Sequence, residues 1–170
     1  MTSQERRVAV EARLRGAQAP LSATALAGEF HVSRQIIVGD VALLRAAGVD
    51  IHATPRGYVM GAERSGVQAV LACVHSSEDM GRELNAIVDN GGEVLDVIVE
   101  HPVYGQLTGQ LRLRSRHDVA QFLQKAEGAS PLSVLTNGIH LHTVRCPDRE
   151  TLERVTQTLR REGFLLESGE

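Results

Sequence analysis

Hydrophobic positions in the first sixty residues recur with the 3.6-residue period of amphipathic helices. The run "RRVAVEARLRGAQAP", residues 6–20, closes with a glycine and a proline and predicts a first helix. Ser22 is the expected N-cap of a second helix in "LSATALAGEF", and Ser33 that of a third in "SRQIIVGDVALLRAAG". Because only "HVS" separates the last two, the sequence predicts a helix-turn-helix. The positions expected to face inward are Ala25, Leu26, Phe30, Ile36, Ile37, Val41 and Leu44.

The next segment, "VDIHATPRGYVM", changes to two short strand-like pieces around a "TPRG" turn. A β-hairpin directly after a helix-turn-helix is a wing. The first residues of the second helix of such a motif meet base edges, so Ser33, Arg34 and Gln35 are the candidate readers of DNA. Arg56 at the wing tip is expected to reach phosphate or the minor groove. The alternative is a three-helix packing unit whose arginines only solvate its surface.

From residue 67 onward, strand-like and helical runs alternate in the order β-α-β-β-α-β, and a further helix follows. This order predicts a ferredoxin-like α+β sandwich, with helices covering one face of a sheet. We therefore divide the chain into a winged helix-turn-helix domain, 1–60, a short polar linker, 61–66, and an α+β domain, 67–170. A terminal strand after the last helix is also conceivable from "GFLL".

Composition and charge narrow the class of protein. The 170 residues are 42% hydrophobic and 23% charged, as in a soluble globular protein. The net charge is −3, but residues 1–60 hold seven basic and five acidic residues, net +2, which leaves −5 for the rest. This charge distribution is more typical of a protein with a DNA-binding amino-terminal domain than of one that binds along DNA without specificity. The sequence has no apolar run of about 20 residues and starts with the polar "MTSQERR", so we expect a cytoplasmic protein without membrane association.

Histidines carry the candidate chemistry of the second domain. In the strand-like run "GIHLHTVRC", His140 and His142 are two residues apart and project from the same face. His75 ends the first strand, and Glu83 lies in the following helix, so all four side chains could converge. Three imidazoles and a carboxylate suit zinc, nickel or iron(II). The alternative is that each histidine is a polar residue on a half-buried sheet.

Other reactive residues are less informative. Cys73 and Cys146 lie on predicted strands without CxxC spacing, so the sequence does not indicate a disulfide framework, and we interpret them as buried, inert thiols. His101 heads the turn "HPVYGQL" and is expected to orient a neighbouring group or to contact a small ligand. The sequence contains no nucleophile motif, GxGxxG or P-loop, so we predict no catalysis.

Longer motifs connect the two domains to one family. The run "SRQIIVGDVALLRAAGVDIHATPRGY" resembles the winged helix of a group of bacterial repressors, and "ELNAIVDNGGEVLDVIVEHPVYGQLTGQL" with "PLSVLTNGIHLHTV" resembles the 3H domain. Joined, they resemble the niacin-responsive transcriptional repressor family from about residue 6 to 165. Two positions depart from the family: Gly39 replaces a basic residue, and Asn137 replaces a glycine, whose left-handed backbone conformation asparagine tolerates.

The resemblance implies a homodimeric repressor of niacin uptake or NAD-precursor genes, which binds operator DNA with nicotinic acid as co-repressor. It assigns one divalent transition metal per chain to His75, Glu83, His140 and His142, and it implies effector contacts by His101 and Tyr104. Two alternatives stay open. The metal could staple the second domain while another small molecule is sensed, or the chain could be a metal-dependent hydrolase with a DNA-binding appendage. The choice of metal, and of nicotinic acid over nicotinamide, also stays open.

Overall fold

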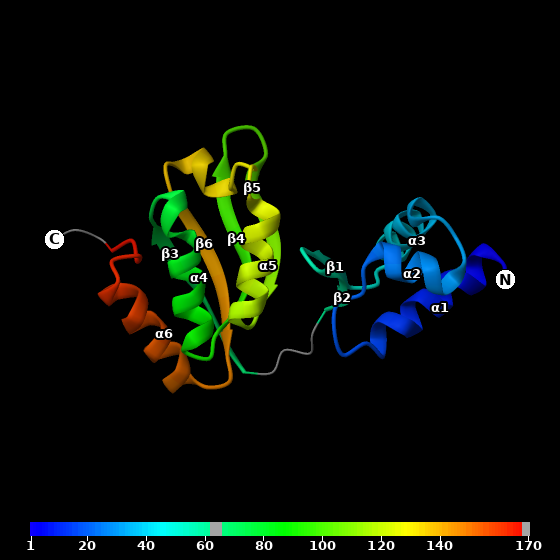
Figure 1. Cartoon of the computed structure of the whole chain (residues 1–170), viewed down its shortest axis with the longest axis horizontal. Coiled ribbons are helices and arrows are strands. Elements are labelled where there is room, and N and C mark those ends of the chain that lie inside the picture. Colours follow the sequence, from blue (N-terminus) through cyan, green and yellow to red (C-terminus); the bar gives the residue numbers. More distant parts are fainter. Residues whose placement is uncertain (62–65, 168–170) are drawn as a thin grey trace. The chain divides into compact units, whose positions relative to one another are not determined.

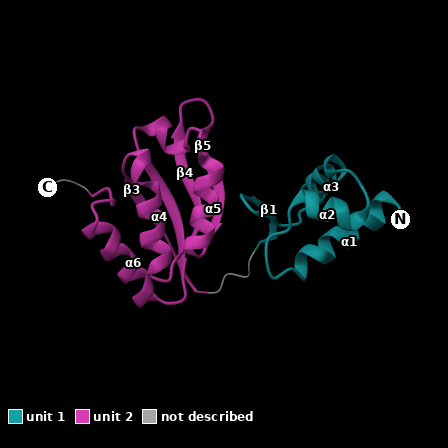
Figure 2. Cartoon of the chain, viewed as in Figure 1, with its two compact units in different colours: residues 1–64 teal, residues 65–170 magenta. Residues whose placement is uncertain are grey.

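The chain forms two compact units, Met1–Arg64 and Ser65–Glu170 (Figure 2). The computed structural model describes residues 1–61 and 66–167. Most of the predicted linker, 61–66, and the last three residues of the predicted second domain lie outside these ranges. Each unit has a hydrophobic core of its own. No helix within the described ranges is long and apolar enough to cross a membrane.

The described part of the first unit begins with a bundle of short helices and ends with a hairpin. Ser22 and Ser33 accept hydrogen bonds from the backbone N–H groups of Ala25 and Ile36 at 3.0 and 3.3 Å, which confirms both predicted N-caps. His31 adopts a left-handed conformation in the short turn between the last two helices. The elements are α1 (Ser3–Arg15), α2 (Ala23–Phe30), α3 (Arg34–Ala46), β1 (Ile51–Thr54) and β2 (Gly57–Met60).

Most of the expected inward positions do form the core of this unit, but two predictions are wrong. Ala25 is exposed, and 41% of the surface of Ile36 is exposed. In α3 the buried stripe runs through Ile37, Val41 and Leu44. Ile36 lies about 100° around the helix from that stripe and faces outward beside the first turn.

The hairpin matches the predicted wing. Strands β1 and β2 pair antiparallel with Thr54 opposite Gly57, so Pro55 and Arg56 form the turn. Gly57 has a φ of +134°, and a Cβ there would overlap the backbone of Leu21. Glycine therefore lets the wing pack closely against the segment that precedes α2.

The second unit combines a four-stranded sheet with helices. Its hydrophobic core contains Leu84, Leu113, Val144 and Leu159. Among its described residues, α4, α5 and α6 cover the same face of the sheet (Figure 1). The elements are β3 (Val67–Val74), the 3-10 helix η1 (Ser77–Asp79), α4 (Met80–Asp89), β4 (Glu93–His101), β5 (Gly105–Leu113), α5 (Arg116–Ala126), the 3-10 helix η2 (Leu132–Thr136), β6 (Ile139–Cys146) and α6 (Arg149–Arg161).

The strands pair antiparallel in the order β3-β6-β4-β5. This confirms the predicted α+β class and the β-α-β-β-α-β succession, and the first and last strands pair directly, as expected. In a ferredoxin-like sandwich the first and third strands are central, whereas here the fourth and second strands, β6 and β4, are central. The succession of elements along the chain does not fix this order, because it depends on pairing between distant segments.

A segment after α6 covers the outer edge of β3. The backbone N–H of Val74 donates to the Phe164 carbonyl at 2.9 Å, and the N–H of Leu166 donates to the Ala72 carbonyl at 2.9 Å. The suggested terminal strand is thus present as an isolated bridge. It protects a strand edge that would otherwise be open to pairing with another chain.

Candidate metal centre and nucleic-acid interface

Three elements of the second unit bring the four predicted metal ligands to one end of the sheet. His75 directly follows β3, Glu83 lies in the first turn of α4, and His140 and His142 lie near the start of β6. In the β3–β6 ladder Cys73 lies opposite His140. The end of β3 therefore brings His75 next to the histidine pair of β6.

The turn before β6 determines how closely these segments approach. Asn137 and Gly138 have positive φ angles of 53° and 88°, so asparagine does sustain the left-handed turn. A Cβ on Gly138 would overlap the carbonyl oxygen of His75. Glycine at this position lets the backbone of the turn lie against His75. The segment that carries His75 therefore lies close to the start of β6, which carries His140.

All three histidine rings face the carboxylate of Glu83. The Nε2 of His140 lies 2.9 Å from Oε2 of Glu83. The Nε2 of His75 contacts the same oxygen, and the Nε2 of His142 contacts Oε1. The Glu83 side chain is fully buried, and at most 4% of each histidine side chain is exposed. The structure thus brings together the full set of four predicted ligands in a site shielded from water.

A backbone carbonyl orients each histidine ring through a hydrogen bond with Nδ1. The Nδ1 atoms of His75, His140 and His142 lie 2.6, 2.8 and 2.7 Å from the carbonyl oxygens of Ser76, Gly138 and Asp96, respectively. A carbonyl can only accept, so each Nδ1 carries the proton of its hydrogen bond. This is the arrangement by which metal-bound histidines are usually held, with Nε2 free to act as the ligand atom.

Glu83 and two of the histidines shift one another's pKa values. Burial raises the pKa of Glu83, but the charge of His142 and hydrogen bonds with all three histidines outweigh burial and hold the pKa well below its usual range. Burial lowers the pKa of His75 and of His142, but the Glu83 carboxylate outweighs it and raises both. Without a metal, added protons on the rings balance the buried carboxylate.

The donor set fits a divalent transition metal. With Nδ1 protonated, a neutral imidazole points the lone pair of Nε2 at the carboxylate, and two acceptors repel each other. Nε2 of His75 and Oε1 of Glu83 are buried and lack a hydrogen bond of normal geometry. A metal bound by these atoms would satisfy both, and imidazole nitrogens with a carboxylate suit zinc, nickel and iron(II).

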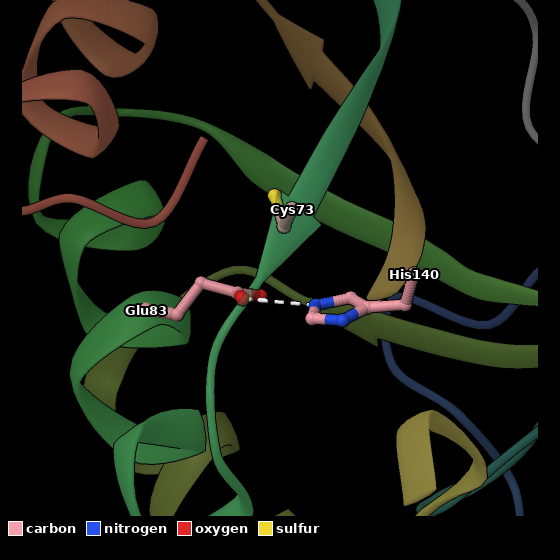
Figure 3. A group of neighbouring side chains, drawn as sticks. All are labelled: Cys73, Glu83 and His140. Atoms are coloured by element: carbon pink, nitrogen blue, oxygen red, sulfur yellow. Dashed lines mark hydrogen bonds and ion pairs between the residues drawn. The ribbon is translucent and has the colours of Figure 1, made fainter. Parts of the chain in front are cut away.

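Sequence reasoning missed one residue beside this cluster. Cys73 is completely buried, and its Sγ, a nitrogen of His140 and a carboxylate oxygen of Glu83 all lie within 4.8 Å of one another (Figure 3). Burial raises the pKa of the Cys73 thiol. The missed signal is spacing, because Cys73 and His75 are two residues apart, as are His140 and His142.

A cleft of about 340 Å³ lies next to the cluster. His140 is among the residues that line the cleft, but its ring faces the cluster, whereas Ile139 and Leu141 project from the opposite face of β6. Figure 1 shows η2 beside the end of β4 that supplies another part of the wall. Its size falls at the small end of the range for ligand pockets. The lining residues are Ile98, Val99, Glu100, Gln106, Thr136, Ile139, His140 and Leu141.

The predicted effector residues lie in the hairpin turn beyond this cleft. Nδ1 of His101 accepts hydrogen bonds from the backbone N–H groups of Val103 and Tyr104 at 3.1 and 3.2 Å. The rings of His101 and Tyr104 lie 5.0 Å apart, and 74% of Tyr104 is exposed. His101 therefore shapes the turn, and neither residue lines the cleft.

In the first unit, the candidate DNA-contacting residues lie on one helix start and on the wing. Arg34 and Gln35 are exposed in the first turn of α3. The hydroxyl of Ser33 caps that helix, so it has a structural role as well. Arg56 lies in the wing turn, where its backbone N–H donates to the hydroxyl of Thr54 at 3.2 Å.

Some basic residues of this unit act within the fold. The Arg6 guanidinium donates two hydrogen bonds, at 2.6 and 3.2 Å, to the buried carboxylate of Asp40 in α3. This pairing fixes α1 against α3 and accounts for part of the positive charge that the sequence places in the first sixty residues. Asp40 also lies 3.8 Å from Arg7.

A winged helix-turn-helix unit joined to an α+β unit with a buried ligand cluster defines a DNA-binding transcription regulator. Residues 6–59 match the model of a helix-turn-helix domain, and residues 68–168 match that of the 3H domain. The chain is 45% identical to the probable transcription repressor NiaR of Thermotoga maritima over 98% of this chain and 96% of that protein. It is 40% identical to the transcription repressor NadR of Bacillus subtilis over 90% of this chain and 88% of that protein.

The chain therefore belongs to the niacin-responsive transcriptional repressor family, in which a helix-turn-helix domain precedes a 3H domain. The resemblance found in the sequence is confirmed. Because these relatives are named a probable transcription repressor and a transcription repressor, and residues 6–59 match a helix-turn-helix domain, the protein is a regulator and not an enzyme, contrary to the hydrolase alternative.

Proposed function

We propose that this repressor controls genes of niacin uptake or NAD-precursor supply, with nicotinic acid as its co-repressor. One observation carries the proposal: His75, Glu83, His140 and His142 converge on one buried point, and His140 also lines the adjoining cleft. The proposal requires a ligand bound at the cleft to reach a metal at that point.

The four residues would hold one zinc, nickel or iron(II) ion per chain. When bound, the metal supplies a Lewis-acid position that can accept the carboxylate or the pyridine nitrogen of nicotinic acid. The protein contributes the orientation of the rings through Ser76, Gly138 and Asp96, and it excludes water from the carboxylate. This site binds the effector and performs no turnover.

The cleft offers both apolar and polar walls to a pyridine ring. Ile98, Ile139 and Leu141 can cover the ring faces, while Gln106 and Thr136 carry hydrogen-bonding groups. His101 and Tyr104 lie one turn beyond Glu100 and Gln106, which pair across β4 and β5. We assign these two residues to the rim of the effector site.

On the DNA side, the proposal assigns base contacts to Ser33, Arg34 and Gln35 and a phosphate or minor-groove contact to Arg56. The protein works as a homodimer in the cytoplasm, paired through the second domain or α6, on a palindromic operator whose half-sites lie about 34 Å apart. Effector binding favours the dimer geometry that fits DNA. By linkage, operator DNA then tightens effector binding by the same factor, about 5 to 150-fold for a typical coupling.

The test is titration calorimetry of nicotinic acid and nicotinamide into the full chain, loaded with zinc or stripped of metal. We expect nicotinic acid to bind the loaded protein and to raise its operator affinity, because effector and metal share one site. Operator affinity that does not respond to either compound would refute the proposed effector. Equal binding with and without metal would separate the effector site from the cluster.

The assignment of Arg34 predicts a loss of sequence-specific binding. Arg34→Ala is expected to weaken operator binding by about 1–3 kcal/mol, because an exposed arginine in the first turn of α3 can donate two hydrogen bonds to guanine. Binding is measured by fluorescence anisotropy at fixed salt with operator and scrambled duplexes. Arg15→Ala is the matched control, since Arg15 pairs with Glu11 on α1. An unchanged operator preference would remove Arg34 from the base-reading set.

A further inference from the structure

Cys73 occupies a position in the site that neither sequence motif assigns. It lies on β3, directly opposite His140 on β6, so both side chains project from the same face of the sheet. Its Sγ is within 4.8 Å of a carboxylate oxygen of Glu83 and of a ring nitrogen of His140 (Figure 3). One torsion angle, χ1, positions this sulfur relative to those groups.

The other cysteine of the chain provides an internal comparison. Cys146 lies on β6 opposite Val67, at the far end of the same ladder that pairs Cys73 with His140. It is 1% exposed and belongs to the same hydrophobic core as Val144 and Val155. The two cysteines thus share strand context and burial, but within the described residues only Cys73 belongs to a group of potential ligands.

The charge of the cluster gives a reason for a sulfur ligand. A divalent metal with one carboxylate and three neutral imidazoles leaves a net charge of +1 in a site where Glu83 is completely buried. Burying an unbalanced charge is costly. A thiolate from Cys73 would bring the net charge to zero without any group from solvent.

We propose that Cys73 is a further ligand of the metal, which makes the site a nitrogen, oxygen and sulfur centre. On metal binding the S–H bond breaks, the proton passes to solvent, and the electron pair of the sulfur forms the bond to the metal. The inference rests on the metal site of the proposed function but not on the identity of the effector. Its consequence is selectivity, since thiolate favours zinc over harder ions such as manganese.

Cobalt(II) is the probe, because a thiolate ligand gives cobalt(II) an intense charge-transfer absorption in the near ultraviolet that imidazole and carboxylate ligands do not give. The full chain is stripped of metal and titrated with cobalt(II) under reducing conditions. We expect this band in the wild-type protein and in Cys146→Ser, and its loss in Cys73→Ser. The weaker visible d–d bands should persist in Cys73→Ser, because the three histidines and Glu83 remain.

The outcomes separate this inference from the proposal on which it rests. Wild-type protein that shows d–d bands without the charge-transfer band would refute sulfur ligation and leave the histidine and carboxylate site in place. No cobalt spectrum at all would refute the metal site itself. A band that disappears in Cys146→Ser and survives in Cys73→Ser would identify Cys146 as the sulfur ligand and overturn the inference. If Cys73→Ser fails to fold, Cys146→Ser still decides, because Cys73 is then the only cysteine in the sequence and the band must persist.

Metal competition gives a second readout. Cys73→Ser should lower zinc affinity roughly 10 to 100-fold, the range seen when a metal site loses a supporting group, and should lower manganese affinity less. The measured quantity is the ratio of zinc to manganese affinity, obtained by competition with a chelating dye. Cys146→Ser should leave this ratio unchanged. An unchanged ratio in Cys73→Ser would contradict a direct sulfur bond.

Discussion

Glu83→Gln is expected to weaken metal binding strongly while the second unit stays folded. The glutamine amide has the size of the carboxylate and can donate to Nε2 of a neutral histidine, so the metal-free variant needs no added protons to balance a buried charge. A divalent metal, however, would face three neutral imidazoles without any anion from Glu83. The effect should be large, because Glu83 is the group that all three rings contact.

Thermal unfolding followed by circular dichroism measures this effect. At a zinc concentration about 100-fold above the dissociation constant, binding stabilises the wild-type protein by about 2.7 kcal/mol, which raises Tm by roughly 10 °C or more for a domain of this size. Glu83→Gln should show no such rise. Glu78→Gln removes the same charge from an exposed position in η1 and should respond to zinc like the wild type. A Glu83→Gln protein that zinc stabilises as strongly as the wild type would exclude the carboxylate as a ligand.

The same variant separates two roles of the metal. If the metal is part of the effector site, folded Glu83→Gln should bind operator DNA without any response to nicotinic acid. If the metal only staples the domain and another molecule is sensed elsewhere, a folded Glu83→Gln protein should respond to its effector as the wild type does.

Local chemistry explains why the first unit could be predicted in detail. Ser22 and Ser33 cap helices through hydrogen bonds to residues three positions ahead, and the "TPRG" turn closes within four residues. Such signals need no knowledge of distant contacts. The sequence predicts the inward-facing positions of the helices less well. Of two adjacent apolar residues such as Ile36 and Ile37, the one that faces the core is determined by packing against α1 or α2.

Part of the candidate metal centre could also be predicted from local sequence signals. The two-residue periodicity of a strand places His140 and His142 on one face before any tertiary contact is known. The contribution of His75 and Glu83 depended on the pairing of the first and last strands, which the β-α-β-β-α-β order allows but does not require. The sequence does not place Cys73 beside His140, because their register exists only once β3 and β6 pair. The positions of β6 and β4 at the centre of the sheet likewise depend on pairing between segments that are distant in the sequence.

The pKa shifts of the cluster set opposite pH dependences for the metal-free and the metal-loaded protein. The pKa values of His75 and His142 are raised above 6.5 in the folded, metal-free protein. Their contribution to stability is therefore fully present below about pH 6.5 and is lost as the pH rises through the raised values. The pKa of Glu83 is lowered from 4.5, so its contribution is lost only under acid conditions, below that value.

We therefore expect the metal-free protein to lose stability as the pH rises above about 6.5, by up to about 1.4 kcal/mol per pH unit for each histidine that titrates. Zinc competes with those protons, so the stabilisation that zinc provides should grow over the same interval at a similar slope. Urea unfolding at several pH values, with EDTA or with saturating zinc, measures both trends. His117→Ala, which removes an exposed histidine at the start of α5, should change neither slope. A metal-free protein that becomes more stable from pH 6 to pH 8 would show that the cluster holds no proton to lose, and that a metal does not replace protons there.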